Sequence, residues 1–191
     1  MKNLLDNFDA STYQRKMGWL YNHLKYRKPK EIIRLLGFLD MYGIDVGAGC
    51  GQYAEVMQSE GYQIVCVDPN EELLKAYSGV KYYCGGEKMP FDDKQFDFSY
   101  TINVLHHAYN PIDILREMRR VSHKVIIGEL NRDNILIRAY IKLLMPFDDW
   151  DEHFSRSWIE KIVRWSGLRI TNYHTSPLVF VPDVFMWFLC E

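Results

Sequence analysis

Short apolar runs alternate with amphipathic stretches along this chain, and the alternation predicts a parallel α/β sheet. The runs have the length and the apolar content of buried strands, and helical patterns separate them. Right-handed crossovers between parallel strands bring the carboxyl ends of all strands to one edge of the sheet. The predicted strands lie at 42–46, 63–67, 80–84, 96–101 and 124–130.

The first 40 residues are predicted to be helical and aromatic-rich. One helix carries Tyr13 and Tyr21 and ends near Pro29, and a second runs from about Glu31 to Leu39. A local basic cluster, typical of a solvated surface rather than of a nucleic-acid site, consists of Lys25, Arg27, Lys28 and Lys30.

Two further apolar runs near the end of the chain, 168–174 and 178–189, predict a strand pair. The second run is nearly all apolar, as expected of a strand inserted inside a sheet and covered on both faces. A surface for membrane or partner binding would have a similar pattern. Before this pair, a helix from Ser157 to Ser166 is closed by Gly167. Residues 133–156, with a predicted amphipathic helix at 135–144 followed by an acidic run, match no motif.

Composition narrows the class of protein only modestly. The 191 residues suffice for one domain with a sizeable core, and 48% hydrophobic and 25% charged residues are ordinary for a soluble globular protein. A formal net charge of −2 gives no global attraction to nucleic acid or to anionic membranes. The four cysteines lack C-x-x-C spacing, which favours reduced thiols in a cytoplasmic protein over a metal site. No apolar run approaches the ~20 residues of a membrane span.

A glycine-rich turn stands between the first two predicted strands. Asp45 is followed by Gly47, Gly49 and Gly51 and then by a helical pattern, and the next strand ends at Asp68. Glycines at alternate positions permit positive φ and let a ligand approach the main chain with no Cβ in the way. The helix N-terminus favours a carboxylate or phosphate, and an acid after the second strand can accept both ribose hydroxyls.

Two ligand classes compete for this turn. A dinucleotide fingerprint, G-x-G-x-x-G, would need a third glycine at position 52, where the chain has Gln52. The pattern present, D-x-G-x-G-x-G, resembles motif I of the class I S-adenosylmethionine-dependent methyltransferases. In that family the glycine loop passes the methionine part of the cofactor, the first acid helps to hold its amino group, and the second acid binds the ribose. The resemblance assigns cofactor binding to Asp45, Gly47, Ala48, Gly49, Gly51, Asp68 and Pro69.

A second segment, GGEKMPFDDKQFDFSYTINVLHH at 85–107, resembles the G-D-A-E-x-L-P-F segment of the same family, with its F-D pair and terminal histidines. A helix with an E-x-x-R-V ending follows (Glu117, Arg120, Val121). The resemblance runs from about Tyr42 to Arg132 and is strongest to the branch that contains the ubiquinone and menaquinone C-methyltransferases. It extends the implied cofactor site to Gly86, Glu87, Met89 and Asn103, with Tyr13 as a lid residue.

The chain departs from the family pattern at two places. Gly85 stands where the family commonly has an aspartate for the adenine amino group, and a backbone carbonyl or Glu87 is the available substitute. The K-P-G-G turn before the fifth strand is absent, and only Ser122 and His123 remain there.

The resemblance implies a single S-adenosylmethionine-binding domain over 1–191. Its fold would be a doubly wound, Rossmann-like methyltransferase fold with a mostly parallel seven-stranded sheet, an antiparallel last strand and helices on both faces. Residues 1–40 would form a helical lid, and 133–156 a substrate-side insertion. The expected activity is methyl transfer, and a small-molecule acceptor is expected in preference to a nucleic acid.

Methyl transfer from a sulfonium depends mostly on in-line positioning and desolvation, and a general base is needed only when the acceptor must lose a proton. His106, His107 and Glu129 lie at the ends of the fourth and fifth strands and are the candidates for that base; no metal is expected. One alternative is a non-catalytic methyltransferase-like scaffold. Another, an NAD(P)-linked oxidoreductase, is disfavoured by Gln52 and by the lack of a Tyr-x-x-x-Lys pair. O-, N- and C-methylation are not distinguished, nor is the oligomeric state.

Overall fold

The computed structural model describes residues 25–37, 39–136, 138–139, 154–178 and 181–191, and a seven-stranded sheet runs through this part of the chain. The strand order is β3-β2-β1-β4-β5-β7-β6, and only β7 runs antiparallel to its neighbours. The predicted mostly parallel sheet with an antiparallel last strand is therefore confirmed. The strands are β1 (Tyr42–Val46), β2 (Gln63–Val67), β3 (Lys81–Tyr82), β4 (Phe96–Ile102), β5 (Ser122–Leu130), β6 (Ile170–Leu178) and β7 (Val181–Cys190).

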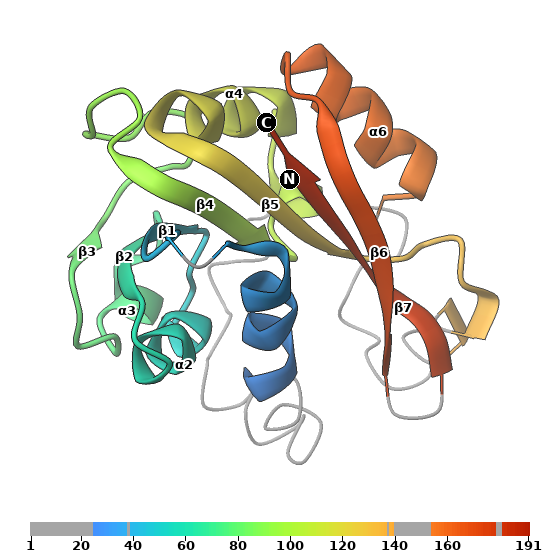
Figure 1. Ribbon diagram of the computed structural model, residues 1–191, viewed down its shortest axis with the longest axis horizontal. Coiled ribbons are helices and arrows are strands. Elements are labelled where there is room, and N and C mark those ends of the chain that lie inside the picture. The colour runs from blue at the N-terminus through green and yellow to red at the C-terminus, as the bar shows by residue number, and fades with distance from the viewer. Residues whose placement is uncertain (1–24, 38, 137, 140–153, 179–180) are drawn as a thin grey trace.

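Helices cover both faces of the sheet (Figure 1). The helix over 25–35 lies on one face together with α2 (Gln52–Ser59) and α3 (Glu71–Leu74). The other face carries α4 (Pro111–Val121) and α6 (Arg156–Trp165). A short 3₁₀ turn, η2 (Leu105–His107), follows β4. Among the described residues, no helix is both long enough and apolar enough to cross a lipid bilayer.

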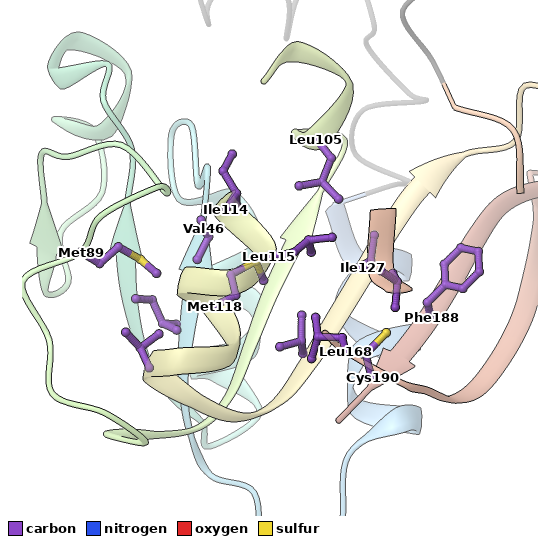
Figure 2. Close-up of a cluster of buried hydrophobic side chains, with 14 of the residues drawn as sticks. Val46, Met89, Leu105, Ile114, Leu115, Met118, Ile127, Leu168, Phe188 and Cys190 are labelled. Atoms are coloured by element: carbon purple, nitrogen blue, oxygen red, sulfur yellow. The ribbon is translucent and has the colours of Figure 1, made fainter. Parts of the chain in front are cut away.

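The core consists of one buried cluster on each face. On the α4 side, Val46 of β1 and Ile127 of β5 pack with Leu115 and Met118 of α4 (Figure 2). On the opposite face, a second cluster includes Ile32, Cys66, Phe98 and Trp187. Because both faces are covered, a central strand such as β4 is buried on both of its faces, with six of its seven residues buried. This explains why the apolar run of β7 lies between β5 and β6, as its pattern predicts.

Short-range signals mark the helix ends. The Asn70 side chain accepts a hydrogen bond from the Leu73 N–H at 3.1 Å and caps α3. Asn110 caps α4, whose first residue is Pro111. Gly167 adopts φ 82° just after α6 and ends that helix. These capping residues lie next to the helix ends that they mark, so a short stretch of sequence is enough to predict them.

Several expected boundaries differ from the structure, and some predicted segments lie outside the described residues. Pro29 does not end a helix, because the helix over 25–35 passes through it and stops before Leu39. Burial of Ile32 and Leu35 outweighs the one backbone hydrogen bond that proline cannot donate. The third strand is Lys81–Tyr82 rather than 80–84, since this edge strand pairs only with the end of β2. Tyr13, most of the expected helix at 135–144 and the acidic run after it lie outside the described residues.

Candidate functional site

The turn after β1 is built from three glycines in the left-handed region. Gly47, Gly49 and Gly51 have φ values of 78°, 55° and 75°. The N–H groups of Gly47 and Ala48 both donate to the Val67 carbonyl, at 2.8 and 3.0 Å, and fix the turn against the end of β2. Gly51 is the N-cap of α2. The turn therefore leads directly into a helix N-terminus, as predicted.

The three glycines have different surroundings. A Cβ on Gly47 would lie 2.5 Å from a Val104 methyl group, and one on Gly51 would lie 2.5 Å from the Tyr77 ring. A Cβ on Gly49 would have no atom within 4 Å. Gly47 and Gly51 are thus required by packing as well as by φ, whereas Gly49 borders open space.

Asp68 follows β2 and lies against the glycine turn. Its Oδ2 accepts a hydrogen bond from the Gly49 N–H at 2.8 Å, and its Oδ1 accepts one from the Asn70 N–H at 2.8 Å. Burial raises the pKa of Asp68, and these two hydrogen bonds partly offset that rise. An ionised carboxylate has about four acceptor positions, so Asp68 can still accept ligand hydroxyls. The turn and the second acid lie on one rim of the sheet.

Asp45 lies beneath the turn and is 1% exposed. Its Oδ2 has no hydrogen-bond partner among the described residues. Burial raises the pKa of Asp45 to about 8; the Tyr100 hydroxyl opposes this rise and the charge of Asp68 adds to it. The carboxyl group of the ligand-free protein is therefore protonated below about pH 8, and an ammonium group from a ligand would favour its ionised form and take the unused oxygen as acceptor.

The loop after β3 brings Glu87 to the position of the missing aspartate. A Cβ on Gly85 would lie 2.5 Å from the Glu87 Oε2, so the Glu87 carboxylate covers the place where an aspartate side chain would begin. A Cβ on Gly86 would lie 2.8 Å from a Val46 methyl group, which leaves no room for a side chain there. The Met89 side chain points into the buried cluster under α4 (Figure 2).

Two residues of α4 hold this loop in place. The Glu117 Oε1 accepts the Met89 N–H at 2.7 Å, and the Arg120 side chain donates to the carbonyls of Phe91 and Met89 at 2.8 and 3.1 Å. Arg120 also bonds to the Asp93 carboxylate at 2.7 Å. The hydrogen bonds from Arg120 hold the pKa of Glu117 below its ordinary value. The E-x-x-R-V ending of this helix therefore positions the loop that carries Glu87.

After β4 the chain turns at Asn103, which has φ 55° without being glycine. Its N–H donates to the Gly128 carbonyl at 2.9 Å, so the turn is fixed to β5. The Oδ1 of Asn103 has no hydrogen-bond partner among the described residues. This side chain lies at the same edge of the sheet as Gly47, because Val104 packs against that glycine.

Glu129 organises the short 3₁₀ turn from inside. It is fully buried, and its Oε1 accepts the N–H groups of Val104 and Leu105 at 3.1 and 2.9 Å. Its Oε2 lies 2.7 Å from the Nδ1 of His106, whose side chain is also buried. The His107 ring lies 4.0 Å from the His106 ring and is exposed. The three candidate bases are therefore together but differ in access to solvent.

Lys28 is a buried residue that the sequence analysis missed. It is 3% exposed, so the expectation of a solvated basic cluster is wrong for this member. Its Nζ lies 4.5 Å from the Phe185 ring centroid and 5.3 Å from that of Tyr53. The available signal was helical spacing, because Lys28 shares one helix face with the buried Ile32 and Leu35.

Two other predicted cofactor residues flank the turn. Pro69 is exposed beside Asp68, and Ala48 is buried within the turn.

Among the described residues, no three His, Cys, Asp or Glu side chains lie close enough together to bind a metal ion. A separate hollow lies at the amino ends of the strands, at the edge opposite the glycine turn, and is lined by Tyr42, Gln58, Tyr62, Gln63, Ile64, Val65 and Val80.

Comparison with known proteins gives three relevant similarities. An uncharacterized protein of Methanocaldococcus jannaschii is 34% identical over 104 residues, which are 51% of this chain and 49% of that protein. A tRNA U34 carboxymethyltransferase of Saccharophagus degradans is 28% identical over 116 residues, or 54% of this chain and 35% of that enzyme. The chain thus spans about half or less of these curated relatives. A crystal structure of a SAM-dependent methyltransferase from Aquifex aeolicus matches in fold, with a TM-score of 0.72, 18% identity and coverage of 96% and 98% of the two chains.

The family model of the methyltransferase domain matches residues 44–124. This segment begins within β1, includes the glycine turn and Asp68, and ends after α4 at the start of β5. Residues 44–124 therefore resemble a methyltransferase domain, and the whole fold is similar to that of a solved SAM-dependent methyltransferase.

Proposed function

We propose that this chain transfers the methyl group of S-adenosylmethionine to a small-molecule acceptor that binds beside the ends of β4 and β5. The observation that carries the proposal is the open face of Gly49 beside the Asp68 carboxylate. A ligand can approach the main chain there, next to an acid that can accept ribose hydroxyls.

The residues at this edge suit each part of the cofactor. Asp68 would hold the ribose, and the unpartnered oxygen of Asp45 would take the amino group of the methionine part. Glu87 lies over Gly85 and would accept the adenine amino group in place of the usual aspartate. When bound, the cofactor supplies an electrophilic methyl group on a sulfonium.

The protein's own contribution to methyl transfer would be positioning and exclusion of water. The pair of Glu129 and His106 is buried and fixes the 3₁₀ turn, so we assign it to positioning. His107 is exposed next to that pair and is our candidate for the base when the acceptor must lose a proton.

An RNA acceptor is the second candidate, because several matched relatives are named as tRNA U34 carboxymethyltransferases. The two acceptor classes differ in a direct assay with radiolabelled S-adenosylmethionine. Label in a small-molecule fraction of a cell extract supports our proposal, and label confined to tRNA replaces it with the second candidate.

Calorimetry with S-adenosylhomocysteine tests the cofactor site itself. We expect Asp68→Ala and Gly49→Val each to weaken binding at least ~10-fold, because the first removes a ribose acceptor and the second fills the open face of the turn. Gly61→Val and Asp92→Ala are the matched controls: Gly61 also has positive φ, and a Cβ there would meet only the Met41 methyl group at 3.8 Å, while Asp92 is exposed. Equal affinity in all four variants and the wild type would remove the ligand assignment. No binding to the wild type would favour the non-catalytic scaffold.

A further inference from the structure

Two tryptophans of α6 are exposed side by side. Trp158 and Trp165 are 38% and 53% exposed, and their rings are in contact, with centroids 5.9 Å apart. The helix packs on the sheet through other residues, since its buried side consists of Ile159, Ile162 and Val163. Large aromatic side chains that are grouped at a surface lose the benefit of burial, and such a group is typical of a binding surface.

The charged residues of α4 and α6 leave an excess of positive charge. The two helices lie next to each other on one face of the sheet (Figure 1). Every acid in these helices is paired with an arginine: Asp113 with Arg116, Glu117 with Arg120 and Glu160 with Arg156. Arg119, Lys161 and Arg164 are exposed and form no ion pair within the described part of the chain. Because the whole chain has a formal net charge of −2, these cations are a local exception.

The unpaired cations lie around the two indole rings. The Lys161 ammonium lies 6.0 Å from the centroid of the Trp158 ring. Arg119 reaches from α4 to the end of α6, because a Cβ on Gly167 would lie 2.6 Å from its guanidinium nitrogen. We call these residues the α4/α6 surface, which is defined by Arg119, Trp158, Lys161, Arg164 and Trp165. Exposed indole rings among unpaired cations are complementary to an anionic partner.

A lipid bilayer fits this surface better than RNA or a second copy of the chain. RNA bases stack on free ring faces, but the Trp158 and Trp165 rings stand at 89° to each other and Lys161 lies over the Trp158 ring. A second copy would bring like charges together across the contact. A bilayer requires no free ring face, because indole rings lie at the level of the lipid headgroups while cations attract anionic lipids.

We propose that the α4/α6 surface binds reversibly to an anionic lipid bilayer, with its tryptophans among the headgroups and its cations next to anionic phosphates. The first turn of α6 adjoins the end of β5, since the Arg132 N–H donates to the Phe154 carbonyl at 3.4 Å. A bilayer on this surface would therefore lie beside the proposed acceptor site. The proposal goes beyond the proposed function and does not depend on it.

Sedimentation with lipid vesicles tests the proposal. The vesicles contain phosphatidylcholine alone, or phosphatidylcholine and phosphatidylglycerol in equal parts, and bound protein is measured at low and at high salt. The wild type should bind the anionic vesicles much more tightly than the neutral ones, and less tightly at high salt, because salt screens exposed charges. Lys161→Gln combined with Arg164→Gln should weaken binding about 30-fold, since each cation near an anionic surface increases affinity about 5-fold.

The tryptophans and the controls are tested in the same assay. Trp165→Ala should weaken binding about 5-fold, because its exposed apolar area no longer leaves water on binding. The matched controls lie on the opposite face of the sheet. Lys30→Gln combined with Lys75→Gln removes two exposed lysines, and Tyr26→Ala removes an aromatic side chain of similar exposure, 57%. Both controls should bind as the wild type does.

Three results would overturn the assignment. The first is a wild type that does not bind anionic vesicles or binds neutral vesicles equally well. The second is an equal loss of binding in the surface variants and the controls. The third is binding of tRNA that the surface variants lose, without any binding to vesicles, which would assign the surface to RNA.

The wild type alone decides if circular dichroism shows that a surface variant does not fold. Its tryptophan emission must then shift to shorter wavelength on anionic vesicles, because indole rings leave water. An unchanged emission spectrum contradicts the proposal.

Discussion

Two turns lie side by side at the carboxyl edge of the sheet and are built in opposite ways. The turn at 47–51 is made of bare main chain, and its central residue, Gly49, borders open space. The turn at 103–107 is filled by side chains, and Glu129 binds it from the buried interior. Both use positive φ, supplied by glycines in the first turn and by Asn103 in the second.

The difference agrees with the roles that we propose for the two turns. A surface of bare N–H and C=O groups can receive a ligand that brings its own functional groups, as we propose for the cofactor. A turn whose main chain is bonded to a buried carboxylate holds protein side chains at fixed positions, as the proposed methyl acceptor site requires. The two turns also support each other, because the Val104 methyl groups occupy the space that a side chain at Gly47 would need.

The largest expected effect comes from removing Glu129, which binds the turn at 103–107 from the buried side. Glu129→Ala leaves two N–H groups and His106 without their buried partner, and we expect it to lower the free energy of unfolding by about 3–5 kcal/mol. Urea denaturation measures this loss. Glu160→Ala on α6 is the control, since its ion pair with Arg156 is largely exposed and should contribute about 0–1 kcal/mol. Equal losses of free energy in the two variants would contradict a stabilising role of Glu129 in the turn at 103–107.

Alanine at two glycines of the first turn separates packing from ligand access. Gly47→Ala meets the Val104 methyl groups and should destabilise the fold by about 2–4 kcal/mol. Gly49→Ala meets no atom, so only its φ of 55° opposes it, at about 1–2 kcal/mol. Thermal unfolding without ligand checks this order. A Gly49 variant that is less stable than the Gly47 variant would contradict the division of roles.

Asp45, beneath the first turn, makes the free energy of unfolding depend on pH. Because burial raises its folded-state pKa to about 8, the folded protein holds a proton that the unfolded chain releases near pH 4. The contribution of this group is thus favourable at low pH and is lost progressively as the pH rises from about 4 to about 8. Asp45→Asn should therefore gain a few kcal/mol relative to wild type between pH 5 and pH 8. Urea midpoints at the two pH values measure the gain, and a constant difference would disprove it.

The smallest effect concerns Glu87, which we propose to contact the adenine of the cofactor. Glu87→Ala should weaken S-adenosylhomocysteine by about 3- to 10-fold, the loss of one hydrogen bond of about 1 kcal/mol. The loss should be absent for S-inosylhomocysteine, which lacks the amino group, and absent in Lys88→Ala, a neighbouring exposed control. Calorimetry with both ligands decides whether Glu87 takes the role of the aspartate that the family commonly has at the position of Gly85.

Much of the molecule was determined by short stretches of its sequence. Apolar runs predict the central strands, Asn70 and Gly167 mark helix ends, and the pattern from Asp45 to Asp68 predicts a glycine turn with an acid on the neighbouring strand. Each of these depends on backbone preferences and periodicity within a few residues, which neighbouring sequence is enough to encode.

Only the tertiary structure decided which groups are buried and which partners they meet. The brace between Glu129 and His106 joins residues 23 positions apart, and Lys28 reaches α2 and β7 from a helix that continues through Pro29. The covering of Gly85 by Glu87 also depends on how one loop folds back. Burial, desolvation and pairing are set by chain segments that are remote in sequence, so no local pattern specifies them.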